Sequence, residues 1–75
     1  MRCELERFSS GWVGIYLRLR PEERDALIEA LRALPGNNHF HLRATFPETS
    51  SEPGIADIEF SFQGDDEPDN LRLDS

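Results

Sequence analysis

The residues with the clearest potential for chemistry are two alternating polar doublets, His39 with His41 and Asp57 with Glu59. Apolar residues occupy the positions between them. This is the period-2 pattern of a β-strand, so both members of a doublet point to the same side of their strand. Two imidazoles and two carboxylates are a ligand set that zinc or a non-haem metal can use. The doublets therefore define the first candidate site of the chain.

The two doublets face each other if the strands that carry them form a hairpin. We assume that Phe46 pairs near Gly54. His41 then lies opposite Glu59, and the Cβ atoms of such a pair are about 5 Å apart. The next pair along places Arg43 opposite the other acid, where its guanidinium supplies the positive charge that a metal would bring. We therefore prefer cross-strand ion pairs and hydrogen bonds on a solvated face, and we predict neither a metal nor another cofactor.

Other catalytic constellations are missing from the sequence. Cys3 alternates into the expected core, and the serines cluster in turns with no histidine near them in sequence, so a cysteine or serine hydrolase is disfavoured. Asp57 and Glu59 resemble a general acid and base only loosely, because positions i and i+2 of a strand lie about 7 Å apart on an open face. The five glycines are scattered and form no phosphate-binding loop. We predict no catalytic residues and no enzymatic activity.

Alternating apolar and polar residues predict four strands, and helical spacing predicts one helix between the second and the third. The strands are expected over residues 1–6, 12–19, 39–46 and 56–62. Pro21 suits the first helical position, and the helix should end near Leu34 because Pro35 follows it. Its apolar stripe consists of Leu27, Ile28, Leu31 and Leu34.

These elements predict an α+β fold, a single ββαββ domain in residues 1–63. We expect a four-stranded antiparallel sheet with the helix packed on one face and water on the other. Residues 64–75 are expected to form an acidic C-terminal tail, because they hold five acids and one arginine. The alternation of Leu71 and Leu73 about Arg72 leaves open a short fifth strand at the sheet edge.

Charge and composition narrow the class of partner. The 75 residues carry fifteen acidic and eight basic side chains, for a net charge of −7. A field of this sign repels phosphate backbones and attracts cationic surfaces, so direct nucleic-acid binding is disfavoured. Acidity can also serve solubility alone. The single cysteine excludes an internal disulfide and favours a reducing, cytoplasmic setting, and no apolar run reaches the roughly 18 residues of a membrane span.

Trp12 and Tyr16 are expected on the side of their strand that faces away from the core, with Arg18 two positions further on. Exposed aromatic and arginine side chains are common anchors of protein interfaces. The alternative is a second small apolar cluster covered by a loop or by the tail. Gly14, between the two aromatic residues, leaves a gap that another backbone or side chain can approach.

Three short motifs in the second half of the chain carry a family resemblance. They are His39-Phe40-His41, Asp57-Ile58-Glu59-Phe60 and Asp66-Glu67-Pro68-Asp69-Asn70. In these motifs the chain resembles small bacterial immunity proteins of polymorphic toxin systems. The resemblance implies a non-enzymatic α+β protein that binds a toxin domain and blocks its active site. It also implies that residues 66–70 are ordered rather than a free tail.

Together these features favour a non-catalytic, acidic protein-binding module that occludes a basic partner, such as a nuclease toxin or a nucleic-acid-binding complex. A phage-encoded inhibitor that mimics nucleic-acid charge is a close variant. Two alternatives remain: a small metal-binding or enzymatic domain built on the two doublets, and a structural homodimer joined through edge strands or the aromatic face. The predicted partner-binding residues are Trp12, Tyr16, Arg18, His39, His41, Arg43, Asp57, Glu59, Asp65, Asp66 and Glu67.

Overall fold

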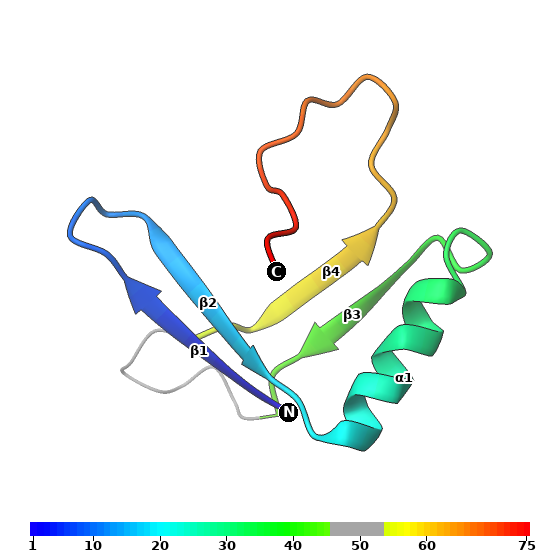
Figure 1. Ribbon diagram of the computed structural model, residues 1–75, viewed down its shortest axis with the longest axis horizontal. Helices are drawn as coiled ribbons and strands as arrows, with labels where there is room; N and C mark the ends of the chain where they lie inside the picture. Colours follow the sequence, from blue (N-terminus) through cyan, green and yellow to red (C-terminus); the bar gives the residue numbers. More distant parts are fainter. Residues whose placement is uncertain (46–53) are drawn as a thin grey trace.

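The fold consists of two β-hairpins and one helix, in the order ββαββ (Figure 1). The computed structural model describes residues 1–45 and 54–75. Its elements are β1 (Arg2–Arg7), β2 (Val13–Arg18), α1 (Pro21–Arg32), β3 (His39–Arg43) and β4 (Asp57–Ser61). The α+β class and the order of the elements are thus confirmed. Within the described residues, no helix combines the length and the apolarity that a membrane crossing requires.

The first hairpin joins β1 to β2 through a turn at residues 9–11. Gly11 adopts a φ of 89°, a left-handed conformation that glycine reaches without steric cost. The amide of Gly11 donates to the carbonyl of Phe8 at 3.0 Å, and the amide of Phe8 donates to the carbonyl of Trp12 at 2.8 Å. Cys3 consequently pairs with Leu17, and the register places all even-numbered residues of the hairpin on one face.

The second hairpin has the register that the sequence predicts. His41 pairs with Glu59 and Arg43 pairs with Asp57, while the amide of Ala44 donates to the carbonyl of Ala56 at 2.9 Å. The assumed pairing of residue 46 lies outside the described residues. On the apolar face of this hairpin, the rings of Phe40 and Phe60 stack with centroids 4.9 Å apart. These two rings and the neighbouring Leu42 and Ile58 are half-buried.

The helix begins at Pro21, as predicted, and its regular turns end at Arg32. The side chain of Glu23 accepts a hydrogen bond from the backbone amide of Arg20 at 2.9 Å, so an otherwise unpaired donor at the helix start is satisfied. The other carboxylate oxygen of Glu23 pairs with the amino group of Met1, which joins the beginning of the first hairpin to the beginning of the helix.

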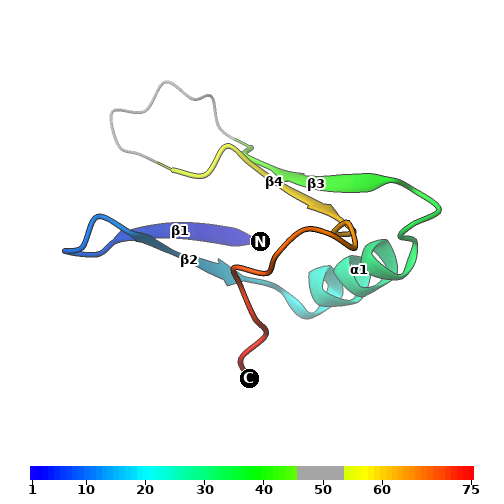
Figure 2. The same ribbon diagram turned by 90° about the horizontal axis from the view of Figure 1, so that it is seen from above.

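The expected four-stranded sheet is not formed. The strands make two separate two-stranded antiparallel sheets, β1 with β2 and β3 with β4. Figure 2 shows the β3–β4 hairpin as one layer, and the β1–β2 hairpin and α1 both lie below it in this view. The physical reason for the error is that alternation assigns faces within a strand and says nothing of which hairpins become neighbours. Each strand therefore keeps one unpaired edge.

The expected core is correspondingly small. Among the described residues, Leu34 is the one buried hydrophobic side chain, at 8 % exposure, and no residue of α1 is buried. Ile28 and Leu31, from the apolar stripe of the helix, are 38 % and 42 % exposed, so the expected packing of the helix on a sheet face is loose. The chain exposes 7051 Å², against about 4,700 Å² for a compact protein of its mass. Its radius of gyration is 14.4 Å, against about 11 Å for a compact domain.

The small core makes Leu34 the most sensitive apolar position. We expect Leu34→Ala to reduce the free energy of unfolding by about 2–5 kcal/mol, because truncation of a buried leucine loses its burial and leaves a cavity. Leu71→Ala is the matched control, since Leu71 is 89 % exposed. It should change the free energy by less than about 0.5 kcal/mol. Urea unfolding followed by circular dichroism measures both, and equal losses would contradict this description of the core.

Because of Glu23, the stability of the fold should decrease at low pH. Its hydrogen bond from the amino terminus, and then that from the Arg20 amide, lower its pKa below the ordinary value of 4.5. A carboxyl with a lowered folded-state pKa adds stability above pH 4.5 that is lost as the pH falls through the folded-state pKa. We expect Glu23→Gln to unfold at a temperature that changes less between pH 6 and pH 3 than that of the unmodified chain. Glu22→Gln is the control for net charge, and identical pH profiles for Glu23→Gln and the unmodified chain would refute the assignment.

Candidate functional site

The polar face of the β3–β4 hairpin gathers both doublets that the sequence singled out. We call it the histidine face, and it consists of His39, His41, Arg43, Asp57, Glu59 and Ser61, because these residues alternate with the stacked phenylalanines and their apolar neighbours. The predicted register brings five of the predicted site residues together here. Ser61, opposite His39, is the sixth member and was not predicted.

His41 lies at the centre of this face. Its side chain is 19 % exposed, and its Nδ1 atom lies 3.0 Å from a carboxylate oxygen of Asp57. Because an ionised carboxylate only accepts hydrogen bonds, Nδ1 carries the proton and donates it. The other ring nitrogen, Nε2, lies 3.5 Å from a carboxylate oxygen of Glu59. His41 thus bridges the two acids of the opposite strand.

The flanks of His41 differ in charge. On one side Arg43 lies with its Nε atom 3.5 Å from a carboxylate oxygen of Asp57. On the other side the ring of His39 meets the ring of His41 edge-to-face, with centroids 5.0 Å apart. One donor atom each from His39, His41 and Glu59 lies within 4.8 Å of the others. The histidine face therefore has a cationic end at Arg43 and, at His39, a donor-rich end where atoms that can ligate a metal ion gather.

The β1–β2 hairpin carries an aromatic face, which consists of Phe8, Trp12 and Tyr16. These side chains are 45 %, 79 % and 47 % exposed. A Cβ atom on Gly14 would lie 3.0 Å from the ring of Phe8. The gap expected at Gly14 is therefore filled by the chain's own Phe8. Sequence reasoning overlooked Phe8, although its even number places it in register with Trp12 and Tyr16.

The charges beside the aromatic face are paired within the chain. Arg18 donates a hydrogen bond to Glu4, which also accepts one from the Nε atom of Arg2 at 3.2 Å. The hydroxyl of Tyr16 donates to Glu6. Arg18, predicted to contact a partner, is thus already engaged in an ion pair. The aromatic face offers a partner mainly apolar surface, flanked by polar side chains that are already bonded within the chain.

The acidic residues 64–75 begin with an ordered turn. The amide of Gly64 donates to the side chain of Glu67 at 2.6 Å, and the amide of Glu67 donates to the carbonyl of Gly64 at 3.1 Å. The side-chain amide of Gln63 donates to a carboxylate oxygen of Asp69 at 2.9 Å. These bonds give residues 64–69 a defined path. Leu71 and Leu73, where a short strand was considered, are outside any strand and are 89 % and 98 % exposed.

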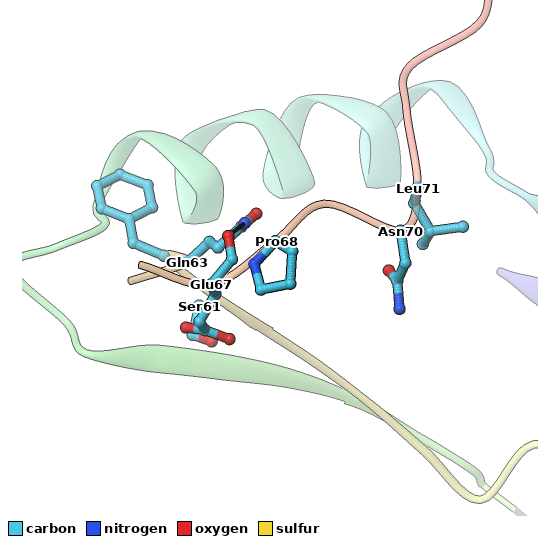
Figure 3. A pocket seen from close by; sticks show the side chains of 7 residues that line it. Ser61, Gln63, Glu67, Pro68, Asn70 and Leu71 are labelled. Carbon is cyan, nitrogen blue, oxygen red and sulfur yellow. Dashed lines mark hydrogen bonds between the residues drawn. The ribbon is translucent and has the colours of Figure 1, made fainter. Parts of the chain in front are cut away.

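An open pocket of about 360 Å³ lies between the end of β4 and this segment (Figure 3). Its lining combines apolar side chains with uncharged polar ones, and Glu67 is the charged residue among them. The lining residues are Ser61, Phe62, Gln63, Glu67, Pro68, Asn70 and Leu71. No pattern in the sequence pointed to Gln63, whose role depends on the turn that folds the segment back.

The predicted partner-binding residues therefore occupy three separate surfaces rather than one. These are the histidine face, the aromatic face with Arg18 on the same side of its hairpin, and the turn that contains Asp65, Asp66 and Glu67. The division follows from the two sheets, because Trp12 and His41 belong to different hairpins. Comparisons with protein-family models, with curated proteins and with solved structures found no match to this chain.

The pairing of Tyr16 with Glu6 gives a spectroscopic test of the aromatic face. The hydrogen bond to Glu6, and then the negative charge of that carboxylate, raise the pKa of Tyr16 above its ordinary value of 10.0. We expect Glu6→Gln to bring this pKa back toward 10, since both effects need the carboxylate. The chain has one tyrosine, so the ultraviolet absorbance of tyrosinate during alkaline titration reports it directly. Glu29→Gln, on the helix, is the control, and an unchanged midpoint in Glu6→Gln would disprove the pairing.

Proposed function

We propose that this protein is a non-catalytic binding module of the inhibitor or immunity type, which occludes a basic protein partner such as a nuclease toxin or a nucleic-acid-binding complex. One observation carries the proposal. Among the described residues, eleven large hydrophobic side chains are exposed and one hydrophobic side chain is buried. Three of the exposed side chains, Phe8, Trp12 and Tyr16, share one face of the β1–β2 hairpin, and apolar surface gathered in this way on a small protein marks a site that another protein covers.

The aromatic face is the contact surface that this proposal favours. Tryptophan and tyrosine bury a large area with few rotatable bonds, which is why they dominate binding energy at many interfaces. Trp12 is the most exposed of the three aromatic residues, at 79 %. The ion pairs of Glu4 and the hydrogen bond of Tyr16 restrict the surrounding polar side chains, which reduces the ordering that binding requires.

Charge selects the partner. Residues 64–75 contribute −4 of the net charge of −7, with five acids against one arginine. The turn at residues 64–67 fixes part of this charge in space. A fixed acidic surface speeds the approach of a basic partner and makes the association sensitive to salt. An inhibitor that mimics nucleic-acid charge, including one encoded by a phage, would use the same chemistry.

A homodimer is the second candidate that a specific observation favours. The chain exposes 7051 Å², about 2,350 Å² more than a compact protein of its mass. Two chains that covered this excess would bury about 4,700 Å², and obligate dimer interfaces bury about 2,000–5,000 Å² in total. The unpaired edges of the four strands are further places where a second copy can add.

The experiment is quantitative affinity capture from the source cells, followed by calorimetry with the captured protein. We expect Trp12→Ala to weaken binding by about 2 kcal/mol or more, as hot-spot aromatics do. The triple change Asp65→Asn, Asp66→Asn and Glu67→Gln should weaken it most at low salt, because it removes long-range attraction. Leu73→Ala, an exposed apolar position that is not part of the aromatic face, is the matched control.

Three outcomes decide between the candidates. A basic captured protein whose binding weakens with salt and with Trp12→Ala supports the proposal. Binding that is indifferent to both changes would argue against it. A dimer mass in sedimentation, lost in Trp12→Ala, with no captured protein would replace the inhibitor by the homodimer.

A further inference from the structure

The donor-rich end of the histidine face has the composition of a metal site. Two imidazoles and one carboxylate recur as ligands of zinc and of non-haem iron. His39, His41 and Glu59 bring this set together, with one donor atom from each within 4.8 Å of the others. Ligand atoms around a tetrahedral zinc ion lie about 3.3 Å apart, from the usual bond lengths of about 2.0–2.1 Å. A contraction of about 1.5 Å at most closes the site.

We expect rotation of the side chains to supply that contraction. His41, the central ligand, is half-buried and held by Asp57, whereas the side chains of His39 and Glu59 are exposed. Exposed side chains change rotamer freely, so the two outer ligands can close on the fixed one. The register of the hairpin keeps the backbones of all three residues in place, since His41 and Glu59 are directly paired.

The proton on His41 leaves the correct nitrogen free. Nδ1 donates to Asp57, at 3.0 Å from both of its carboxylate oxygens. The other ring nitrogen, Nε2, faces the carboxylate of Glu59 at 3.5 Å. In the tautomer that donates from Nδ1, the lone pair of Nε2 points toward that carboxylate, and a cation between the two atoms would be bound by both. A ligand histidine whose other nitrogen donates to a carboxylate is the usual arrangement in zinc proteins.

Arg43 does not take the place of the metal. Its guanidinium lies against Asp57, with Nε 3.5 Å from a carboxylate oxygen, at the opposite end of the face from His39. In the described part of the chain, the ion pair that Glu59 forms is the one with His41. The positive charge of Arg43 therefore balances the carboxylate behind His41, and the charge of Glu59 is left for the ion.

We propose that His39, His41 and Glu59 bind a divalent transition-metal ion, with zinc as the ion that suits them, and that Asp57 acts as a positioning residue that orients His41. The site is independent of the proposed inhibitor function, because it uses neither the aromatic face nor the acidic turn. Three protein ligands leave a fourth position open to solvent, where water or a ligand side chain of another protein binds. Zinc would also join β3 to β4 and stabilise the hairpin.

The test is zinc titration of the purified, metal-free chain, by calorimetry and by backbone NMR, with cobalt absorbance as a report of coordination. We expect one ion per chain, with the signals of His39 and His41 shifted first. His41→Ala and Glu59→Gln should each lower the affinity by more than about 100-fold. Asp57→Asn should lower it by about 10–100-fold, the range for residues that support a ligand. Cobalt bound to the unmodified chain should show the intense visible bands of four-coordinate geometry.

Two controls separate this site from general binding to an acidic surface. Glu29→Gln removes an exposed acid from the helix and should leave the affinity unchanged. His39→Ala alters an exposed ligand, so it decides the matter if His41→Ala fails to fold. Zinc binding that is equally strong in His39→Ala and in the unmodified chain, or that requires several ions per chain, would overturn the proposal. A chain that binds no zinc at micromolar concentration would do the same.

Discussion

Pairing inside each hairpin is the interaction on which the rest of the structure depends. β1 pairs with β2 and β3 pairs with β4, and no backbone ladder joins one hairpin to the other in the described part of the chain. Each hairpin therefore sets its own register and its own two faces. The core between the elements adds little, since Leu34 is the one hydrophobic side chain buried among the described residues. Local pairing positions the functional groups, and long-range packing does not.

This division explains what the surfaces are suited to do. The histidine face is precise, because directly opposed strand positions hold His41 against Glu59 and, diagonally, against Asp57. The aromatic face is broad and exposed, because no other element of the described chain covers it. A cluster of ligand atoms with a fixed geometry is suited to bind a small ion, whereas a broad apolar face is suited to bind a protein. The two surfaces lie on different hairpins, so each can be changed without direct damage to the other.

The features that could be predicted from the sequence are local ones. The turn before Gly11, the helix start at Pro21 and the pairing of His41 with Glu59 follow from residue type and from period-2 alternation. The division into two sheets could not be predicted in this way, because the same alternation fits one sheet or two. The position of Phe8 over Gly14 was available from the even numbering of the aromatic face. The pairing of Gln63 with Asp69 was not, since it depends on the path of an irregular segment.

The isolated chain buries little apolar surface, and the apolar surface that it leaves exposed is available to another molecule. The slope of the unfolding free energy against urea concentration measures this most directly, because the slope scales with the surface that unfolding exposes. For the monomeric chain, followed by far-ultraviolet circular dichroism, we expect a slope below about 1 kcal/mol per molar urea, the lower end for small compact proteins. A slope at or above that value, with a midpoint that does not depend on protein concentration, would show a compact core and contradict it.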